Sequence, residues 1–423
     1  MMKILLTNRN FLSMWFSNFI SILNSRFSEL VIPLVVLGLT SSPLITGLVA
    51  LSQQLGTVLF AIPIGTWAER KNKVRLAATC YFLYAFCNFL LAYFIFQNQA
   101  NEVFIAFILF FMGILALISR TAFNTMIPNV AGRQKLLEAH TSLEAADAIC
   151  TLIGPAIGGA LLAAAGAGIT LALCGFLFIF SMIFILIVKH REKTTDYRKK
   201  HVFMKSRIDD FIRQSVEGLN YLVANPPQLI STLVMCILGF STVFIVLTVI
   251  FHARLSFDLS EELIGILLSS AGVGNIIGVF MMKWFKNANW LLLFSMLLLI
   301  SSLGVLIILI TNQFLVMCLG MLIFDGALSM AFVVQGAVHQ GITPDEFLSR
   351  VRSATYVVSG IFSMLGTFLA GAIPEVTTSK VALGLGVAML AVPGIYIIKF
   401  KRFSVKFSKI EPVYLKEKSG KKA

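Results

Sequence analysis

Long apolar runs alternate with short polar segments along almost the whole chain. A helix that crosses the hydrocarbon core of a membrane needs roughly 20 mostly apolar residues, and twelve runs of about this length follow one another. The predicted spans are residues 11–37, 44–64, 76–96, 103–124, 140–165, 169–189, 228–251, 263–283, 290–311, 314–336, 351–372 and 380–400. We therefore predict an all-α membrane protein with twelve transmembrane helices.

The longest polar stretch divides these helices into six and six. The predicted parts are an N-terminal half at 1–190, a cytoplasmic linker at 191–226, a C-terminal half at 227–400 and a basic cytoplasmic tail at 401–423. Within the linker, apolar residues recur at helical spacing over residues 208–219, which predicts an amphipathic helix on the inner membrane surface.

The two halves are related in sequence. Residues 154–159 (GPAIGG) align with residues 366–371 (GTFLAG), 212 positions later. Two related six-helix halves in parallel orientation, with a site between them, are the arrangement of alternating-access carriers. We therefore expect pseudo-symmetric halves that move against each other.

Composition and charge support a membrane protein. Of the 423 residues, 58% are hydrophobic and 13% are charged, whereas a soluble domain is about half apolar and a quarter charged. The net charge of +14 comes from basic residues that fall mainly in alternate connections between the apolar runs. This alternation is the positive-inside pattern. It predicts a multi-pass protein of the cell membrane, in a bacterium, with both termini in the cytoplasm and no nucleic-acid partner.

The six cysteines lie scattered in apolar runs, without a CxxC pair or a His–Cys cluster. They read as small buried residues rather than disulfides or metal ligands. We expect no bound metal and no cofactor.

Two motifs point to a family. Gly65-Thr-Trp-Ala-Glu69-Arg70-Lys71-Asn-Lys73 joins the second and third predicted helices, and Gly154-Pro155-x-x-Gly158-Gly159 lies in the fifth. With these motifs the chain resembles the major facilitator superfamily. Further stretches, among them Arg120-Thr-Ala-Phe-Asn124, resemble the branch of macrolide-efflux proteins and the enterobactin exporter.

The resemblance implies a role for each motif. The implied gating loop comprises Gly65, Glu69, Arg70, Lys71 and Lys73, with Glu69 standing where the family usually has Asp. Its acid and arginine would latch the inner face, although an ordinary positive-inside turn also explains the loop.

The second motif resembles one shared by exporters that run as antiporters. Small residues permit close helix approach, and Pro155 weakens the backbone ladder and allows bending. Close packing without directional meaning is the alternative.

Charged residues inside the predicted spans are candidates for proton coupling, because an ionised group at mid-bilayer costs roughly 2.5–3.5 kcal/mol on insertion scales. Asp325, near the middle of the tenth span, is the first candidate, with a structural hydrogen bond as the alternative. Arg26 and Glu29 lie three residues apart on one face of the first span. They form either a self-neutralising pair or a coupling pair in which a proton on Glu29 frees Arg26.

Further candidates lie on other helices. Glu144 and Asp147 share a face of the fifth helix, and they either carry protons or reach the cytoplasmic interface. Many antiporters of the superfamily carry an arginine on the fourth helix, and Arg120 lies on the fourth predicted helix here. Snorkelling of its side chain to the membrane interface explains Arg120 equally well. Asn24 and Gln335 are candidates for the substrate cavity, or for hydrogen bonds between helices.

These observations predict a secondary transporter that exports an amphipathic small molecule, such as a macrolide antibiotic, in exchange for protons. ATP as the driving force is disfavoured, because the sequence has no Gly-x-x-x-x-Gly-Lys-Ser/Thr phosphate loop. Export of an endogenous siderophore or peptide, or lipid transport, is the alternative. A polytopic membrane enzyme is a remote one, since neither HExxH nor GxSxG occurs. The expected partners are the substrate, protons and the lipid bilayer, and the resemblance favours a monomer.

Overall fold

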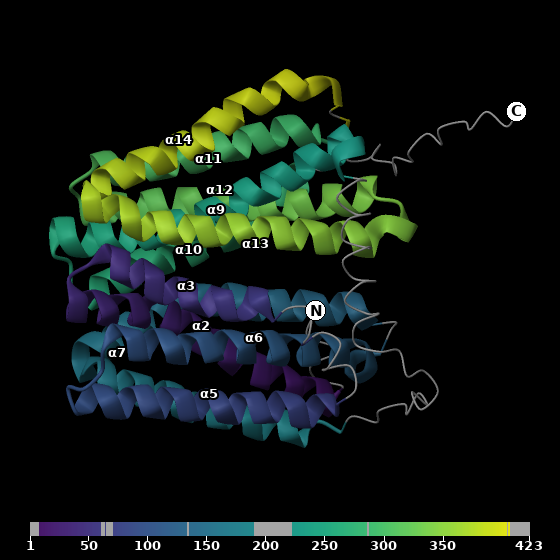
Figure 1. Ribbon diagram of the computed structural model, residues 1–423. Helices are drawn as coiled ribbons and strands as arrows, with labels where there is room; N and C mark the ends of the chain where they lie inside the picture. Colours follow the sequence, from purple (N-terminus) through teal and green to yellow (C-terminus); the bar gives the residue numbers. More distant parts are fainter. Residues whose placement is uncertain are drawn as a thin grey trace, which may run out of the picture. The chain divides into compact units, whose positions relative to one another are not determined.

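The computed structural model describes residues 8–60, 64, 71–132, 135–189, 222–285, 287–403 and 405–406. This part of the chain is almost entirely helical (Figure 1). The α-helices are α2 (Arg9–Thr40), α3 (Pro43–Leu59), α5 (Lys73–Phe96), α6 (Glu102–Ala131), α7 (Leu136–Ile187), α9 (Pro226–Phe251), α10 (Glu261–Met281), α11 (Trp290–Ile310), α12 (Phe314–Ile342), α13 (Asp345–Val376) and α14 (Ser379–Ile397). Shorter turns are the π-helical η3 (His252–Ser256) and the 3₁₀ segments η4 (Met282–Phe285) and η5 (Ile398–Phe403).

Ten helices in the described residues are long and apolar enough to cross a membrane. One of them, α7, is interrupted at Gly166, where φ is +75°, so α7 supplies two of the predicted spans. The 17-residue α3 is shorter, and its predicted continuation runs into residues 61–63, which lie outside the described part. With α7 counted twice and α3 included, the predicted twelve-helix fold is confirmed.

The predicted break between the fifth and sixth spans lies at Gly166. The two spans were predicted to end at residue 165 and to begin at residue 169, and the two helical parts of α7 meet between these positions. Glycine lacks a Cβ, so it adopts a positive φ at little cost and reverses the chain direction within a single residue.

Polar residues define where several helices begin. The side chains of Asn8, Ser42, Asn72 and Asn101 accept backbone N–H groups from the first turns of α2, α3, α5 and α6, respectively. Such caps satisfy donors that the helix itself leaves free.

The chain separates into two compact units. Unit 1 comprises the described residues within Met1–Lys199, Val246–Val273 and Thr367–Val381, and unit 2 those within Lys200–Ile245, Gly274–Gly366 and Ala382–Ala423. The boundaries run through α9, α10, α13 and α14. The predicted division into halves therefore stays a prediction, and the linker helix at 208–219 lies outside the described residues.

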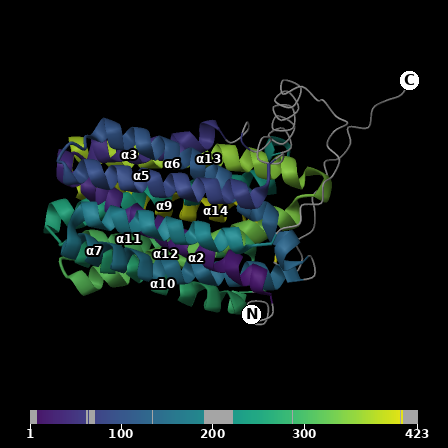
Figure 2. The same ribbon diagram turned by 90° about the horizontal axis from the view of Figure 1, so that it is seen from below.

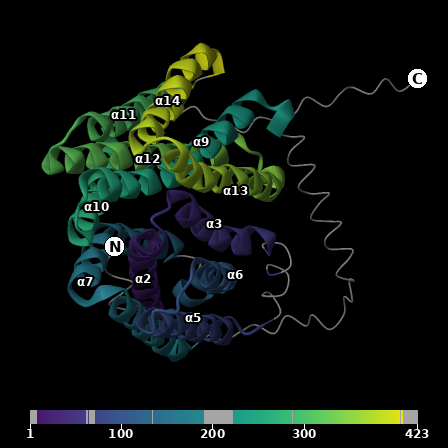
Figure 3. The same ribbon diagram turned by 60° about the vertical axis from the view of Figure 1, so that its left-hand side comes forward.

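Unit 1 is built around α7, which packs along α2 and α5, while α3 packs along α6 (Figures 1 and 3). Tyr84 of α5 stacks on Phe178 of α7 at 4.5 Å between ring centroids. The buried amide of Asn24 donates to the Cys174 carbonyl at 2.8 Å, and Ser17 Oγ donates to the Ser181 carbonyl at 2.8 Å. Polar groups thus tie α2 to the second part of α7.

Unit 2 contains α11 and α12 side by side (Figures 2 and 3). Their backbones come close at Gly304 and Gly320, and Ser301 Oγ donates to the Phe324 carbonyl at 2.9 Å. Gly326 of α12 also meets the backbone of Gly274 at the unit-2 part of α10. Small residues therefore set the helix spacing in this unit, as is common in membranes.

Candidate proton-coupling site

Arg26 lies in the middle third of α2. At a rise of 1.5 Å per residue it is about 25 Å from Arg9 and about 21 Å from Thr40 along the helix axis. Its Nη1 is 3.0 Å from Glu29 Oε2, one turn further along α2. Its Nη2 is 3.0 Å from Asp147 Oδ1 and 3.3 Å from Oδ2, on α7. We call Arg26, Glu29 and Asp147 the charged cluster.

The cluster is not electrically balanced. One guanidinium faces two carboxylates, so one negative charge is left over when both acids are ionised. The exposed fractions of the side chains are 28% for Arg26, 60% for Glu29 and 41% for Asp147, so the cluster is accessible from outside the helix pair. A surplus carboxylate within membrane-spanning helices is stabilised by taking up a proton or by meeting a cation.

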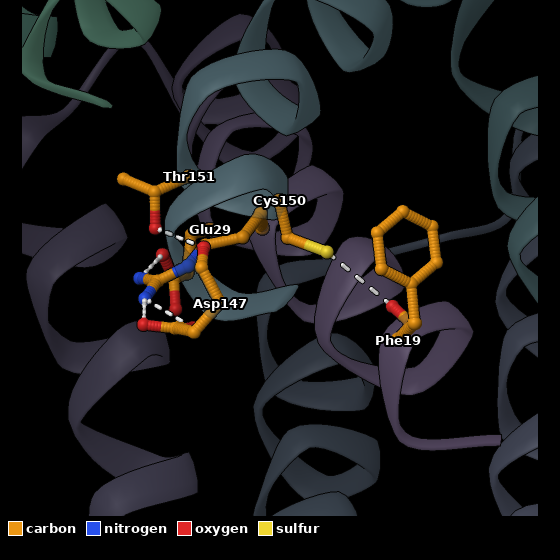
Figure 4. A network of polar contacts seen from close by, with 6 residues as sticks. Phe19, Glu29, Asp147, Cys150 and Thr151 are labelled. Atoms are coloured by element: carbon orange, nitrogen blue, oxygen red, sulfur yellow. Dashed lines mark hydrogen bonds and ion pairs between the residues drawn. The ribbon is translucent and has the colours of Figure 1, made fainter. Parts of the chain in front are cut away.

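Two further polar contacts lie beside the cluster, one within α7 and one between α7 and α2 (Figure 4). Thr151 Oγ1 donates to the Asp147 carbonyl at 2.9 Å, and Cys150 Sγ donates to the Phe19 carbonyl of α2 at 3.4 Å. In Figure 4 the carboxylates of Glu29 and Asp147 lie near each other, although they come from different helices. The bond from Cys150 therefore joins α7 to α2 about one turn beyond Asp147.

The glycine motif of α7 borders this cluster. A Cβ added to Gly154 would lie 2.6 Å from Arg26 Cβ, and one added to Gly158 would lie 3.3 Å from Phe27 Cα. Real Cβ atoms do not approach neighbours as closely as the first distance. The absence of a side chain at Gly154 is thus what allows the stem of Arg26 to lie against α7.

The opposite side of the same motif meets the unit-1 part of α10. A Cβ on Gly159 would collide with the Glu261 carbonyl, and one on Gly265 with the Pro155 carbonyl. The backbone N–H of Ala156 donates to Ser269 Oγ at 2.9 Å. Pro155 has no N–H to donate, so the helical ladder of α7 is weakened where α10 supplies an acceptor. One short segment of α7 therefore contacts both the charged cluster and α10.

The remaining candidate residues are not members of the charged cluster. Glu144 is exposed one turn before Asp147, and Arg120 is exposed on α6. Asn24 is fully buried, and its Oδ1 has no partner in the described residues. In unit 2, Gln335 is buried and its Nε2 donates to the Ser231 carbonyl at 3.4 Å, while Asp325 is half-buried on α12.

Only part of the predicted gating loop is described. Gly65, Glu69 and Arg70 lie outside the described residues. Lys73 is the first residue of α5, and its Nζ donates to the Lys71 carbonyl at 2.7 Å. The latch role of this loop stays a prediction.

Sequence reasoning paired Arg26 with Glu29 but missed the bond from Arg26 to Asp147, across 121 residues. It also missed Ser269. The glycine at position 154 was the available signal, because it marks a close helix approach, but it does not name the partner helix.

Comparison with known proteins places the chain in a family and a fold. The family model described as Major Facilitator Superfamily matches residues 14–371. No curated protein sequence matches the chain significantly.

Solved structures with the same fold include three transporters. The nucleoside transporter NupG is 12% identical to this chain. The match covers 93% of this chain and 99% of NupG, with a TM-score of 0.70. A bacterial homologue of the human lysosomal transporter Spinster, inward-facing and occupied, has 14% identity, coverage of 93% and 96%, and a TM-score of 0.72. A bacterial homologue of the iron transporter ferroportin, also inward-facing, has 13% identity, coverage of 93% and 98%, and a TM-score of 0.69. At these identities the likeness concerns the fold.

Proposed function

The chain belongs to the Major Facilitator Superfamily, and from this premise we propose that it exports an amphipathic small molecule in exchange for protons. Transport by a multi-pass membrane protein follows from the family. The direction, the coupling ion and the type of cargo are our proposal. The observation that carries it is the charged cluster, in which one arginine is shared by two carboxylates from two membrane-spanning helices.

The fold leaves the cargo open. The three structural neighbours are named as a nucleoside transporter, a Spinster homologue and a ferroportin homologue. One architecture thus serves chemically different cargoes, and the function has to be argued from the site. An amphipathic cargo is supported by the resemblance to macrolide-efflux proteins and by the placement of the charged cluster within apolar helices.

Protonation of the cluster supplies a coupling step. With both acids ionised, Arg26 bridges α2 and α7 through Asp147 and also holds Glu29. A proton on Asp147 removes the interhelix ion pair and leaves Arg26 with Glu29 alone. The cluster is then neutral and better suited to a low-dielectric environment. Proton uptake therefore changes the contact between two helices rather than a single side chain.

The glycine motif connects that change to α10. Arg26 lies against Gly154, and the next residues, Pro155 and Ala156, meet Gly265 and Ser269. A shift of α7 at the weakened ladder alters both contacts together. We propose that this segment links proton uptake to alternating access, in which the protein exchanges between two populated conformations.

The test is transport by the purified full chain in proteoliposomes under an imposed pH gradient. The panel contains a macrolide, a tetracycline, a siderophore, a lysolipid and a nucleoside. We expect the gradient to drive accumulation of at least one panel member, and a protonophore to abolish it. Accumulation of a siderophore or lysolipid alone would favour the alternative cargo class. Substrate movement that is indifferent to both the gradient and the protonophore would contradict proton antiport.

Both termini in the cytoplasm and a monomeric state are also part of the proposal. They are supported by the alternating basic connections and by the family resemblance. Protease accessibility of the C-terminal tail in sealed inside-out and right-side-out vesicles tests the orientation.

A further inference from the structure

The end of α13 reaches the beginning of α3. Near the end of α13, Glu375 places its Oε2 2.7 Å from Ser42 Oγ and 3.1 Å from the backbone N of Leu44. Both groups donate to the carboxylate. Ser42 Oγ also accepts the N–H of Ile45 at 3.2 Å, as the cap of α3. The carboxylate therefore satisfies a free N–H group of the first turn of α3 and orients the hydroxyl that caps it.

The two helices are close together behind this contact. A Cβ on Gly371 would lie 2.6 Å from the Pro43 carbonyl oxygen and 3.1 Å from Gly47 Cα. Further along, Gln54 Nε2 donates to Thr367 Oγ1 at 2.8 Å. The unit-1 part of α13 thus follows α3 over several turns, and Glu375 closes the end of this contact.

Within the described residues, no cation pairs with Glu375. The sequence of α3 contains no ionisable residue, and Glu375 is the only one in the unit-1 part of α13. The next cation along the chain is Lys380, which is exposed at the start of α14. On the α9–α10 connection, Arg254 is 3.2 Å from Glu261 and 3.9 Å from Asp258. The negative charge is instead stabilised by the hydrogen-bond donors and the positive end of the α3 helix dipole.

We propose that Glu375 is a clasp between α13 and α3 that opens when the carboxylate takes up a proton. When ionised it holds the helices together, and when protonated it lets them separate. A proton removes the attraction to the helix dipole, and it turns charge-assisted hydrogen bonds into neutral ones of about half the strength. The proposal deepens the proposed function, because it gives the transporter a second proton-sensitive contact. On the predicted topology this contact is at the outer face, where the incoming protons of an antiporter arrive.

Hydrogen exchange of the full chain in lipid nanodiscs tests the clasp, with the backbone amides of residues 44–48 as the reporter. In Glu375→Gln these amides should exchange roughly ten to a hundred times faster than in the wild type, the factor expected for losing hydrogen bonds to a charged group. In the wild type their exchange, corrected for the intrinsic effect of pH, should also speed up when the pH is lowered. Glu375→Gln should lose this pH response.

Glu262→Gln is the matched control, since it removes an exposed carboxylate from the first turn of another helix. It should leave the exchange of the amides of residues 44–48 unchanged. Ser42→Ala gives a second readout if Glu375→Gln folds poorly, and it should accelerate the same amides. Equal protection in wild type, Glu375→Gln and Ser42→Ala would overturn the clasp.

The exchange experiment on Glu375 and the transport experiment on the charged cluster can succeed or fail separately. Loss of protection in Glu375→Gln, together with unchanged proton coupling in Asp147→Asn, would keep the clasp and overturn the proposed coupling site. The opposite pair of results would keep the coupling site and overturn the clasp.

Discussion

The two copies of the glycine motif, residues 154–159 in α7 and 366–371 in α13, use the same packing. A Cβ on the first glycine would meet a neighbouring helix in both copies, at 2.6 Å from Arg26 Cβ for Gly154 and at 2.7 Å from the Phe240 carbonyl oxygen for Gly366. The last glycine of each copy meets a further helix, with Gly159 against α10 and Gly371 against α3. The repeat in the sequence is therefore a repeat of helix contacts.

The chemistry beside the two copies differs. Gly154 lies against the cation of the charged cluster, whereas Gly366 lies against Phe240, whose ring stacks on Phe244 at 5.3 Å between centroids. The residue 212 positions after Asp147 is Ser359, which is buried and donates to the Tyr356 carbonyl at 3.2 Å. The glycines thus serve packing in both copies, and the charges distinguish the copy to which we assign proton coupling.

Replacing Arg26, the cation that distinguishes the first copy of the motif from the second, should have the largest effect on proton-driven transport. In Arg26→Gln the carboxylates of Glu29 and Asp147 lose their shared partner, and the ion pair between α2 and α7 is removed. Proton-driven transport should fall by roughly ten- to a hundredfold, as for the loss of charged hydrogen bonds. Arg26→Lys, which keeps the charge without the planar fork, should restore part of it. At the second copy, Phe240→Leu should change thermal stability and leave proton coupling intact. If Arg26→Gln and Phe240→Leu lost proton coupling equally, the two copies would not differ in function.

A methyl group at either first glycine should separate packing from coupling. Gly154→Ala and Gly366→Ala both force overpacking, which costs about 1–3 kcal/mol, so both should unfold at lower temperature in detergent. Only Gly154→Ala should also weaken proton-driven transport, because it displaces the stem of Arg26. If Gly366→Ala altered the coupling as much as Gly154→Ala does, packing alone would explain both motifs.

The hydrogen bond from Ala156 to Ser269 should give the smallest effect. Ser269→Ala leaves the Ala156 N–H without its acceptor on α10 and should lower stability by about 0.5–1.5 kcal/mol. Ser270→Ala is the matched control, since that hydroxyl donates to the Leu267 carbonyl of its own helix at 2.6 Å. Thermal unfolding of the two variants measures the difference, and a Ser270→Ala variant that is destabilised as much as Ser269→Ala would contradict a specific α7–α10 contact.

The fold could be predicted because the length of an apolar run identifies a spanning helix, and the charge of the adjoining connections indicates its orientation. Both signals are local in the sequence. Each span needs only its own residues to be recognised, and caps such as Asn72 and Asn101 are visible at the helix starts. The break at Gly166 falls between the predicted fifth and sixth spans, although the sequence does not show that the two helices meet at a single residue.

The charged cluster could be predicted only in part. Arg26 and Glu29 are three residues apart, so helical spacing alone pairs them. Asp147 joins them from another helix, and although Gly154 marks a close helix approach, it does not specify α2 as the partner. The contact of Glu375 with Ser42 is hidden for the same reason, across 333 residues.

Substrate-induced proton movement in proteoliposomes tests the central claim most directly, by comparing the wild type with Asp147→Asn, Glu144→Gln and Asp325→Asn. A pH-sensitive dye inside the vesicles reports protons, and the substrate is one identified by the panel. The cluster predicts that Asp147→Asn abolishes the substrate-induced proton signal while Glu144→Gln and Asp325→Asn retain it. A signal that survives Asp147→Asn and disappears in Asp325→Asn would contradict the account and move the coupling site to α12.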